Sequence, residues 1–134
     1  MEIKNNRHAC YKLEYHLIVV TKYRKKLINN TLKIDLINET KILFEEKWHC
    51  EIININTDQD HIHILFESYP TLNLSTFINS YKSASSRKMR TVFKSMLCRF
   101  YWKPYFWSRS YFICTVSEKS LQYVQQYIQD QVIK

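Results

Sequence analysis

Two histidines separated by one residue, His61 and His63, are the first side chains in this sequence that could do chemistry. Side chains alternate between the two faces of a β-strand, so both histidines lie on one face, with Cα atoms about 7 Å apart. Two imidazoles at this spacing can bind one divalent metal ion if a third ligand is supplied. The same spacing also occurs in ordinary polar pairs on a solvated sheet face, and the pair alone leaves both interpretations open.

A tyrosine and a glutamine near the end of the chain form a second candidate pair. Tyr127 and Gln131 lie four residues apart in a predicted helix over residues 118–132, and therefore on the same side of it. The predicted apolar stripe of this helix comprises Leu121, Val124, Ile128 and Val132. At about 100° per residue, Tyr127 flanks this stripe. A tyrosine in that position is also an ordinary boundary residue.

Tyrosine suits phosphoryl transfer because it can hold the phosphate as a covalent ester, which conserves the energy of the broken bond. Its pKa of about 10 makes it a poor nucleophile at neutral pH. A divalent cation on the phosphate would compensate by neutralising the phosphate oxygens and orienting the phosphorus. The candidate ligands of such a cation are His61, His63 and the side-chain oxygen of Gln131.

The charge of the chain is arranged in long segments of one sign. The net charge is +8, and neither residues 15–34 nor residues 68–117 contain an acidic residue. Such segments indicate a polyanionic partner, and nucleic acid is the partner they favour. The candidate DNA-contacting residues are Lys22, Arg24, Lys25 and Lys26 in a loop, and Lys82, Arg87 and Arg90 on a predicted helix. A plain basic loop and a solvated helix face are the alternatives.

Three aromatic residues in the basic region have two possible roles. Trp102, Tyr105 and Trp107 could stack on unpaired bases, or they could fill a core or an interface.

Composition excludes several other classes of protein. The 134 residues predict a single domain over residues 1–134, and no apolar run is long enough to cross a membrane. The first residues lack the apolar segment of a signal peptide, so we expect a cytoplasmic protein. The chain contains no glycine, which excludes glycine-rich phosphate-binding loops. No two cysteines have the CxxC spacing that a zinc ribbon or a thioredoxin site requires.

The order of the predicted elements is β-α-β-β-α-β followed by a helix. The expected strands cover residues 12–21, 50–57, 61–67 and 111–116, and the expected helices cover residues 31–48, 74–95 and 118–132. This order predicts an α+β fold, a ferredoxin-like antiparallel sheet with helices on one face and an added C-terminal helix. Ile62, Ile64 and Phe66 should then face the helices, and the two histidines should face the open side.

Three local features are also predicted. Thr31 is the expected N-cap of the first long helix. Asn29-Asn30 is the expected place for positive φ in a chain without glycine. Ile53 and Ile55 should share one face of their strand.

Five segments, in order and with their spacing, resemble the single-tyrosine HUH transposases of small insertion sequences, the TnpA-like proteins and their REP-associated tyrosine transposase relatives. The segments are YHLIVVTKYRKKLI, the pattern D-x-x-HIHIL, the pattern Y-K-x-x-S-S-R, FWSRSYFICTV and YIQDQ. Together they extend from about residue 15 to residue 131.

The resemblance assigns a role to each candidate residue. It implies that His61 and His63 bind Mg²⁺ or Mn²⁺ with Gln131 as the third ligand, and that Tyr127 is the nucleophile. Members of this family cut and rejoin single-stranded DNA at the ends of their element through a 5′-phosphotyrosine. They recognise a DNA hairpin near each end and act as homodimers with shared active sites. No membrane partner is implied.

Three other functions fit parts of the same sequence. A ferredoxin-like sheet with exposed aromatic residues and a basic surface also describes a non-catalytic module that binds single-stranded nucleic acid. A domesticated relative that cuts dispersed genomic repeats would carry the same catalytic residues. A metal-dependent hydrolase would use the histidine pair with water, and it would survive the loss of the Tyr127 hydroxyl.

Overall fold

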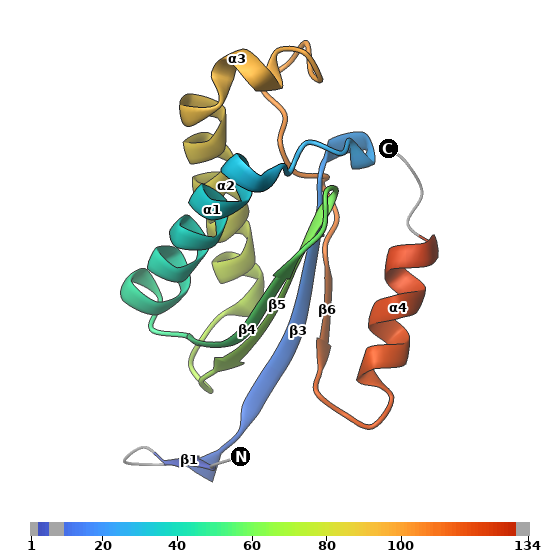
Figure 1. Ribbon diagram of the computed structural model, residues 1–134. Helices are drawn as coiled ribbons and strands as arrows, with labels where there is room; N and C mark the ends of the chain where they lie inside the picture. The colour runs from blue at the N-terminus through green and yellow to red at the C-terminus, as the bar shows by residue number, and fades with distance from the viewer. Residues whose placement is uncertain (1–2, 6–9, 131–134) are drawn as a thin grey trace.

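The centre of the molecule is an antiparallel sheet, seen in a computed structural model that describes residues 3–5 and 10–130 (Figure 1). Its four strands lie in the order β4–β5–β3–β6. These strands are β3 (Leu13–Val20), β4 (Glu51–Thr57), β5 (His61–Ser68) and β6 (Phe112–Thr115). A small separate ladder joins β1 (Lys4–Asn5) to β2 (Cys10–Tyr11).

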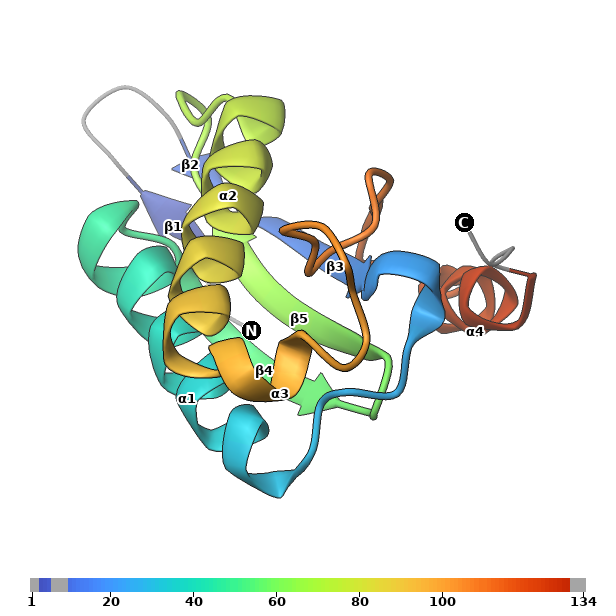
Figure 2. The ribbon, with the colours of Figure 1, turned by 90° about the horizontal axis from the view of Figure 1, so that it is seen from above.

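The helices lie on both faces of this sheet (Figures 1 and 2). One face carries α1 (Asn30–Lys41), its π-helical continuation η2 (Ile42–Lys47), α2 (Leu74–Val92) and the short α3 (Lys94–Leu97). The opposite face carries α4 (Ser120–Asp130). The predicted ferredoxin-like order is confirmed, but the histidine face is partly covered by α4 and is not open as expected. No helix among the described residues is long and apolar enough to cross a membrane.

The alternation of β5 builds the core on the α1/α2 face, as predicted. Ile62, Ile64 and Phe66 are fully buried there. Phe44 packs against Phe66 with ring centroids 5.2 Å apart and against Phe77 at 4.8 Å. Burial of such rings is the main favourable term in folding, so this face holds the fold together.

Two asparagines cap the long helices. The side chain of Asn29 accepts a hydrogen bond from the Leu32 N–H at 2.8 Å, and Asn73 does the same for Thr76 at 3.1 Å. The prediction of Thr31 as the N-cap is wrong because Asn29 occupies that position and places Thr31 in the first turn.

The positions of positive φ also differ from the prediction. Asn29 is extended, with φ −84°. The left-handed residues among those described are Tyr23, Arg24 and His49, with φ of 60°, 51° and 59°. Tyr23 and Arg24 lie in η1 (Lys22–Arg24), a 3-10 turn directly after β3. A side chain with a Cβ costs roughly 1–2 kcal/mol in this conformation, so other contacts must hold this turn.

An irregularity in β4 changes the side chains that face the core. The pairing register with β5 shifts between Ile52 and Asn54, as in a β-bulge. Ile52 and Ile55 therefore pack against the core, while Ile53 is 42% exposed. The expectation that Ile53 and Ile55 share a face is wrong because an extra residue in one strand reverses the alternation.

Candidate active site

Helix α4 docks on the sheet through a narrow apolar contact, here called the α4 patch. Its members are Ile18, Val20 and Val124, which are buried, and Phe112, Cys114, Tyr127 and Ile128, which are partly buried. Leu121, predicted to belong to the apolar stripe, is 61% exposed. Val132 lies outside the described residues. The side of α4 that faces the sheet is therefore rotated from the predicted stripe toward Tyr127.

Tyr127 faces the sheet instead of flanking the contact. Its ring packs against Phe112 with centroids 5.0 Å apart. Its hydroxyl is buried and has no hydrogen-bond partner among the described residues. Burial raises the pKa of this hydroxyl, and the nearby Ser110 hydroxyl and Arg24 charge act in the opposite direction. In this position the phenol is neutral at pH 7 and shielded from a large substrate.

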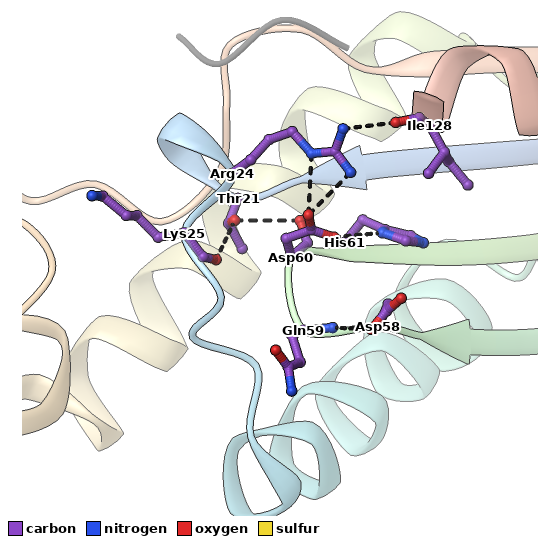
Figure 3. Close-up of polar contacts among 8 residues, drawn as sticks. All are labelled: Thr21, Arg24, Lys25, Asp58, Gln59, Asp60, His61 and Ile128. Carbon is purple, nitrogen blue, oxygen red and sulfur yellow. Dashed lines mark hydrogen bonds and ion pairs between the residues drawn. The ribbon is translucent and has the colours of Figure 1, made fainter. Parts of the chain in front are cut away.

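His61 is held by the residue that precedes it. Its Nδ1 lies 2.8 Å from Asp60 Oδ1 (Figure 3), and because a carboxylate can only accept, the imidazole donates this hydrogen bond. The Nε2 lone pair of a neutral His61 is thereby left available. A carboxylate behind a histidine in this way fixes its tautomer and strengthens it as a metal ligand. Nothing in the sequence singled out Asp60 as a partner of His61.

His63 is linked to α4 through a chain of hydrogen bonds. Ser120 Oγ donates to the Ser117 carbonyl at 2.9 Å, so it must accept from His16 Nε2 at 3.2 Å. Nδ1 of a neutral His16 is then an acceptor, and His63 Nε2–H donates to it at 2.9 Å. In this arrangement the free lone pair of His63 is on Nδ1. Nothing in the sequence assigned a role in the candidate site to His16 or Ser120.

Burial keeps this histidine network neutral. It lowers the pKa of His63 to about 4, with further contributions from the charges of His16 and His61. Burial also lowers the pKa of His16. Neutral imidazole is the form that binds metals.

The site supplies part of a metal-binding set. His61 and His63 each retain one nitrogen with a free lone pair, which fits two of the ligands of a divalent cation. No group of three or more His, Cys, Asp or Glu side chains that could hold a metal occurs within residues 3–5 and 10–130. The predicted third ligand, Gln131, lies outside the described residues.

Arg24 connects the histidine strand to α4 (Figure 3). Its guanidinium pairs with Asp60 Oδ2 through Nη2 at 3.0 Å and Nε at 3.1 Å. Its Nη1 donates to the carbonyl of Ile128 at 2.7 Å. These bonds join a carboxylate that orients His61 to the residue next to Tyr127, and they offset the strain of the left-handed backbone. Contact of Arg24 with DNA stays a prediction.

The other predicted DNA-contacting residues are distributed around this end of the sheet. Lys25, Lys26 and Arg87 are exposed, whereas Lys22 and Arg90 are half-buried. Lys82 is also half-buried and donates to the carbonyl of Arg109 at 2.7 Å, and burial lowers its pKa to about 8. Lys82, Arg87 and Arg90 line one surface hollow of about 390 Å³, so the structure brings these three together.

The fold and the site together define a ferredoxin-like domain in which a histidine strand and a tyrosine helix share one face of the sheet. The model of the family described as "Transposase IS200 like" matches residues 9–131. The chain therefore belongs to the IS200-like transposase family, whose members cut and rejoin DNA.

Relatives and solved structures agree with this assignment. The chain is 30% identical to the ISDra2 transposase TnpA of Deinococcus radiodurans, over 98% of this chain and 92% of the relative. It is 27% identical to the transposase of insertion sequence element IS200 from Salmonella typhimurium, over 96% and 83% of the two chains.

Two solved structures share the fold. The crystal structure of a candidate transposase from Deinococcus radiodurans R1 superposes with a TM-score of 0.88 at 30% identity, over 98% of this chain and 100% of that one. A REP-associated tyrosine transposase bound to a REP hairpin superposes with a TM-score of 0.57 at 12% identity, over 92% of this chain and 68% of that one. At that identity, the second likeness concerns the fold alone.

Proposed function

We propose that this protein is a metal-assisted transposase that cuts and rejoins single-stranded DNA at the ends of its element, with Tyr127 as the nucleophile. The main support is the meeting of β5 and α4 on one face of the sheet. There, Arg24 joins Asp60, which holds His61, to the carbonyl of Ile128. Two elements far apart in the sequence thus bring a histidine pair and a tyrosine into one region.

The proposed chemical step is a transesterification. The Tyr127 oxygen attacks the scissile phosphorus and forms a 5′-phosphotyrosine, an ester to the 5′ end of the strand that lies on the 3′ side of the cut. The bond from phosphorus to the 3′-oxygen breaks, the phenol loses its proton, and the leaving oxygen takes up a proton to become a 3′-hydroxyl. No water and no nucleotide triphosphate is consumed, so attack by a 3′-hydroxyl on the phosphotyrosine reverses the step and rejoins the strands.

The histidine pair would hold the cofactor, Mg²⁺ or Mn²⁺, together with Gln131. When bound, this cation supplies charge neutralisation at the scissile phosphate and a fixed orientation of the phosphorus. Asp60 and His16 keep His61 and His63 in defined tautomers. The nitrogen ligands favour Mn²⁺, which binds imidazole more strongly than Mg²⁺ does.

The buried hydroxyl of Tyr127 implies that α4 must shift before it reacts. The helix is attached by the narrow α4 patch and by polar contacts at Ser120 and Ile128, which such a movement would exchange. We propose that the active form is a homodimer with shared active sites, in which α4 can serve the histidines of the partner. Exposed Lys25, Lys26 and Arg87 would contact the phosphates of a DNA hairpin.

A covalent-adduct assay tests this proposal. The protein is mixed with labelled single-stranded DNA from both flanks of its own gene, with Mn²⁺, with Mg²⁺ or with EDTA, and run on denaturing gels. We expect a metal-dependent shift in protein mobility that Tyr127→Phe abolishes while still binding DNA. His61→Ala and His63→Ala should also abolish the adduct and retain most of the affinity for the hairpin, because basic residues dominate binding.

Other results would point to the alternative functions. Tight binding without an adduct on either flank would contradict the proposal and favour a binding module or a relative with dispersed genomic targets. Cleavage that persists in Tyr127→Phe would favour a metal-dependent hydrolase. Binding that does not weaken as salt rises would contradict the assignment of the basic residues to phosphate contacts.

A further inference from the structure

A second hollow lies outside the histidine and tyrosine site, where the end of α2, α3 and the segment that follows it meet. Its volume is about 240 Å³, enough for one nucleobase. Its walls combine positive charge with aromatic rings, from Arg90, Lys94, Lys103, Tyr101, Trp102 and Tyr105. None of these residues has a place in the proposed cleavage chemistry.

Trp102 gives this hollow an exposed stacking surface. Its side chain is 82% exposed, although tryptophan is one of the largest apolar residues. Lys103 Nζ lies 4.6 Å from the centre of its ring. Trp107, five residues later, is buried and its Nε1 donates to Ser85 Oγ at 2.9 Å. The fold therefore uses Trp107 in the core and leaves Trp102 with no comparable structural role.

The wall formed by Tyr101 and Tyr105 is held by contacts within the fold. The Tyr101 hydroxyl donates to the carbonyl of Lys22 at 2.6 Å, and its ring meets that of Tyr105 edge to face with centroids 6.0 Å apart. Lys22 Nζ lies 4.9 Å from the centre of the Tyr105 ring. A flat ligand between Trp102 and this wall would meet aromatic surface on a preformed site, with cations at its edges.

A track of positive charge leads away from this hollow. The larger hollow along α2 shares three of its residues, Arg90, Pro104 and Tyr105. The other cations that line the larger hollow are Lys82, Arg87 and Arg109. A hollow with aromatic walls that opens onto a row of cations fits a nucleotide, because the base can stack while the backbone phosphates lie along the row.

The turn η1 connects the hollow at Trp102 to the candidate active site. The backbone N–H of Lys22 donates to the carbonyl of Phe106 at 2.8 Å. The backbone N–H of Thr21, the residue before the turn, donates to the carbonyl of Asp60 at 2.9 Å. The start of this turn thus contacts both the segment that lines the hollow, at Phe106, and Asp60, which holds His61. In Figure 1, α3 and the loop that follows it lie at the same end of the sheet as the β4–β5 turn.

We propose that the hollow at Trp102 is a subsite for one unpaired base of single-stranded DNA, with the flanking phosphates held by Arg90 and the cations along α2. This inference rests on the proposed function for its ligand, DNA. The subsite lies outside the cleavage site and would contact an unpaired base directly. Because a paired base cannot enter it, this contact would distinguish single-stranded DNA from duplex.

The test compares two exposed aromatic residues of one segment. Phe100 is 37% exposed and does not line the hollow, so Phe100→Ala is the matched control for Trp102→Ala. Binding is measured by fluorescence anisotropy with labelled oligothymidylate of about 12 nucleotides, and with the same strand paired to its complement. Because a base that stacks on an aromatic ring loses this contact when the ring is removed, we expect Trp102→Ala to weaken single-strand binding roughly tenfold. Duplex binding should change less than about twofold, and Trp102→Phe should restore most of the loss.

Two readouts separate this inference from the proposed function. In the wild type, oligothymidylate should quench tryptophan fluorescence, and Trp102→Phe should remove that quenching. Equal single-strand affinities for Trp102→Ala and Phe100→Ala would overturn the subsite, as would equal losses on single strand and duplex. If either of these results came with a covalent adduct on the flanking DNA, the subsite would be contradicted and the proposed function would still be supported. Trp102-dependent binding without any adduct would support the subsite and contradict the proposed function.

Discussion

The two faces of the sheet are built from the same strands but differ in almost every physical respect. Among the described residues, the α1/α2 face holds a cluster of 20 buried side chains, and the α4 face holds three. The first cluster is apolar and rich in interlocked aromatic rings. The second adjoins three histidines, an arginine–aspartate pair and a buried tyrosine hydroxyl. The comparison indicates that one face provides stability, whereas the other holds the candidate site and a helix attached by a narrow contact.

The largest expected effect is on the α1/α2 face. Phe66→Ala removes a fully buried ring that packs against Phe44 and Phe77, and such truncations cost about 3–5 kcal/mol. Val124→Ala, on the α4 face, should cost only about 1 kcal/mol. Urea denaturation of both variants measures the free energy of unfolding. Equal losses would show that α4 is as firmly integrated as the core.

A smaller effect is expected at the connection between the two elements of the site. Arg24→Ala removes the ion pair with Asp60 and the bond to the Ile128 carbonyl. We expect the free energy of local opening of α4 to fall by about 1–2 kcal/mol, measured by amide hydrogen exchange, with strands β3 and β5 unchanged.

Lys25→Ala is the matched control, because Lys25 is a neighbouring cation whose side chain is exposed. If both variants loosened α4 equally, the effect would come from the loss of positive charge and not from the bonds that Arg24 makes.

Removing the Tyr127 hydroxyl should have little effect on stability. The Tyr127 hydroxyl is buried without a partner among the described residues, so Tyr127→Phe removes an uncompensated polar group. The variant should be as stable as the wild type or more stable by up to about 1 kcal/mol, measured by thermal or urea unfolding. A clear loss of stability would reveal a hydrogen bond that holds α4 in place.

The reactivity of two cysteines offers the finest comparison of the faces. Burial raises the pKa of the Cys50 thiol to about 12 on the α1/α2 face, and it also raises the pKa of Cys114 beside α4. A raised pKa reduces the thiolate present at pH 8, so both should alkylate slowly, and Cys50 the more slowly because it is fully buried. Mass spectrometry with the exposed Cys10 and Cys98 replaced by serine measures both rates.

Arg24→Ala should accelerate the alkylation of Cys114 and leave that of Cys50 unchanged. Parallel acceleration of both would mean that the two faces open together.

Local patterns predicted the fold and the placement of the histidines. The alternation of β5 was sufficient to assign Ile62 and Ile64 to one face and His61 and His63 to the other, because a strand has a fixed period of two. The pattern was insufficient for β4, where a single bulge reversed the alternation at Ile53. Bulges have no strong sequence signal in a chain without glycine.

Long-range contacts were beyond prediction from the sequence. Arg24 was identified as a cation for DNA, but its partners are Asp60 and a backbone carbonyl 104 residues away. The sheet-facing side of α4 was misplaced by the exposed Leu121, since the orientation of a helix depends on the surface that receives it. That surface here consists of Ile18 and Val20 on β3 and of Phe112 and Cys114 on β6.

The alternation of β5 also protects against error during folding. A strand that slipped by one residue would move His61 and His63 into the aromatic core and turn Ile62 and Ile64 toward α4. Such a form would lose the site and the stability of the core in the same step. One register of this strand therefore sets both the stability of the core and the position of the histidine pair.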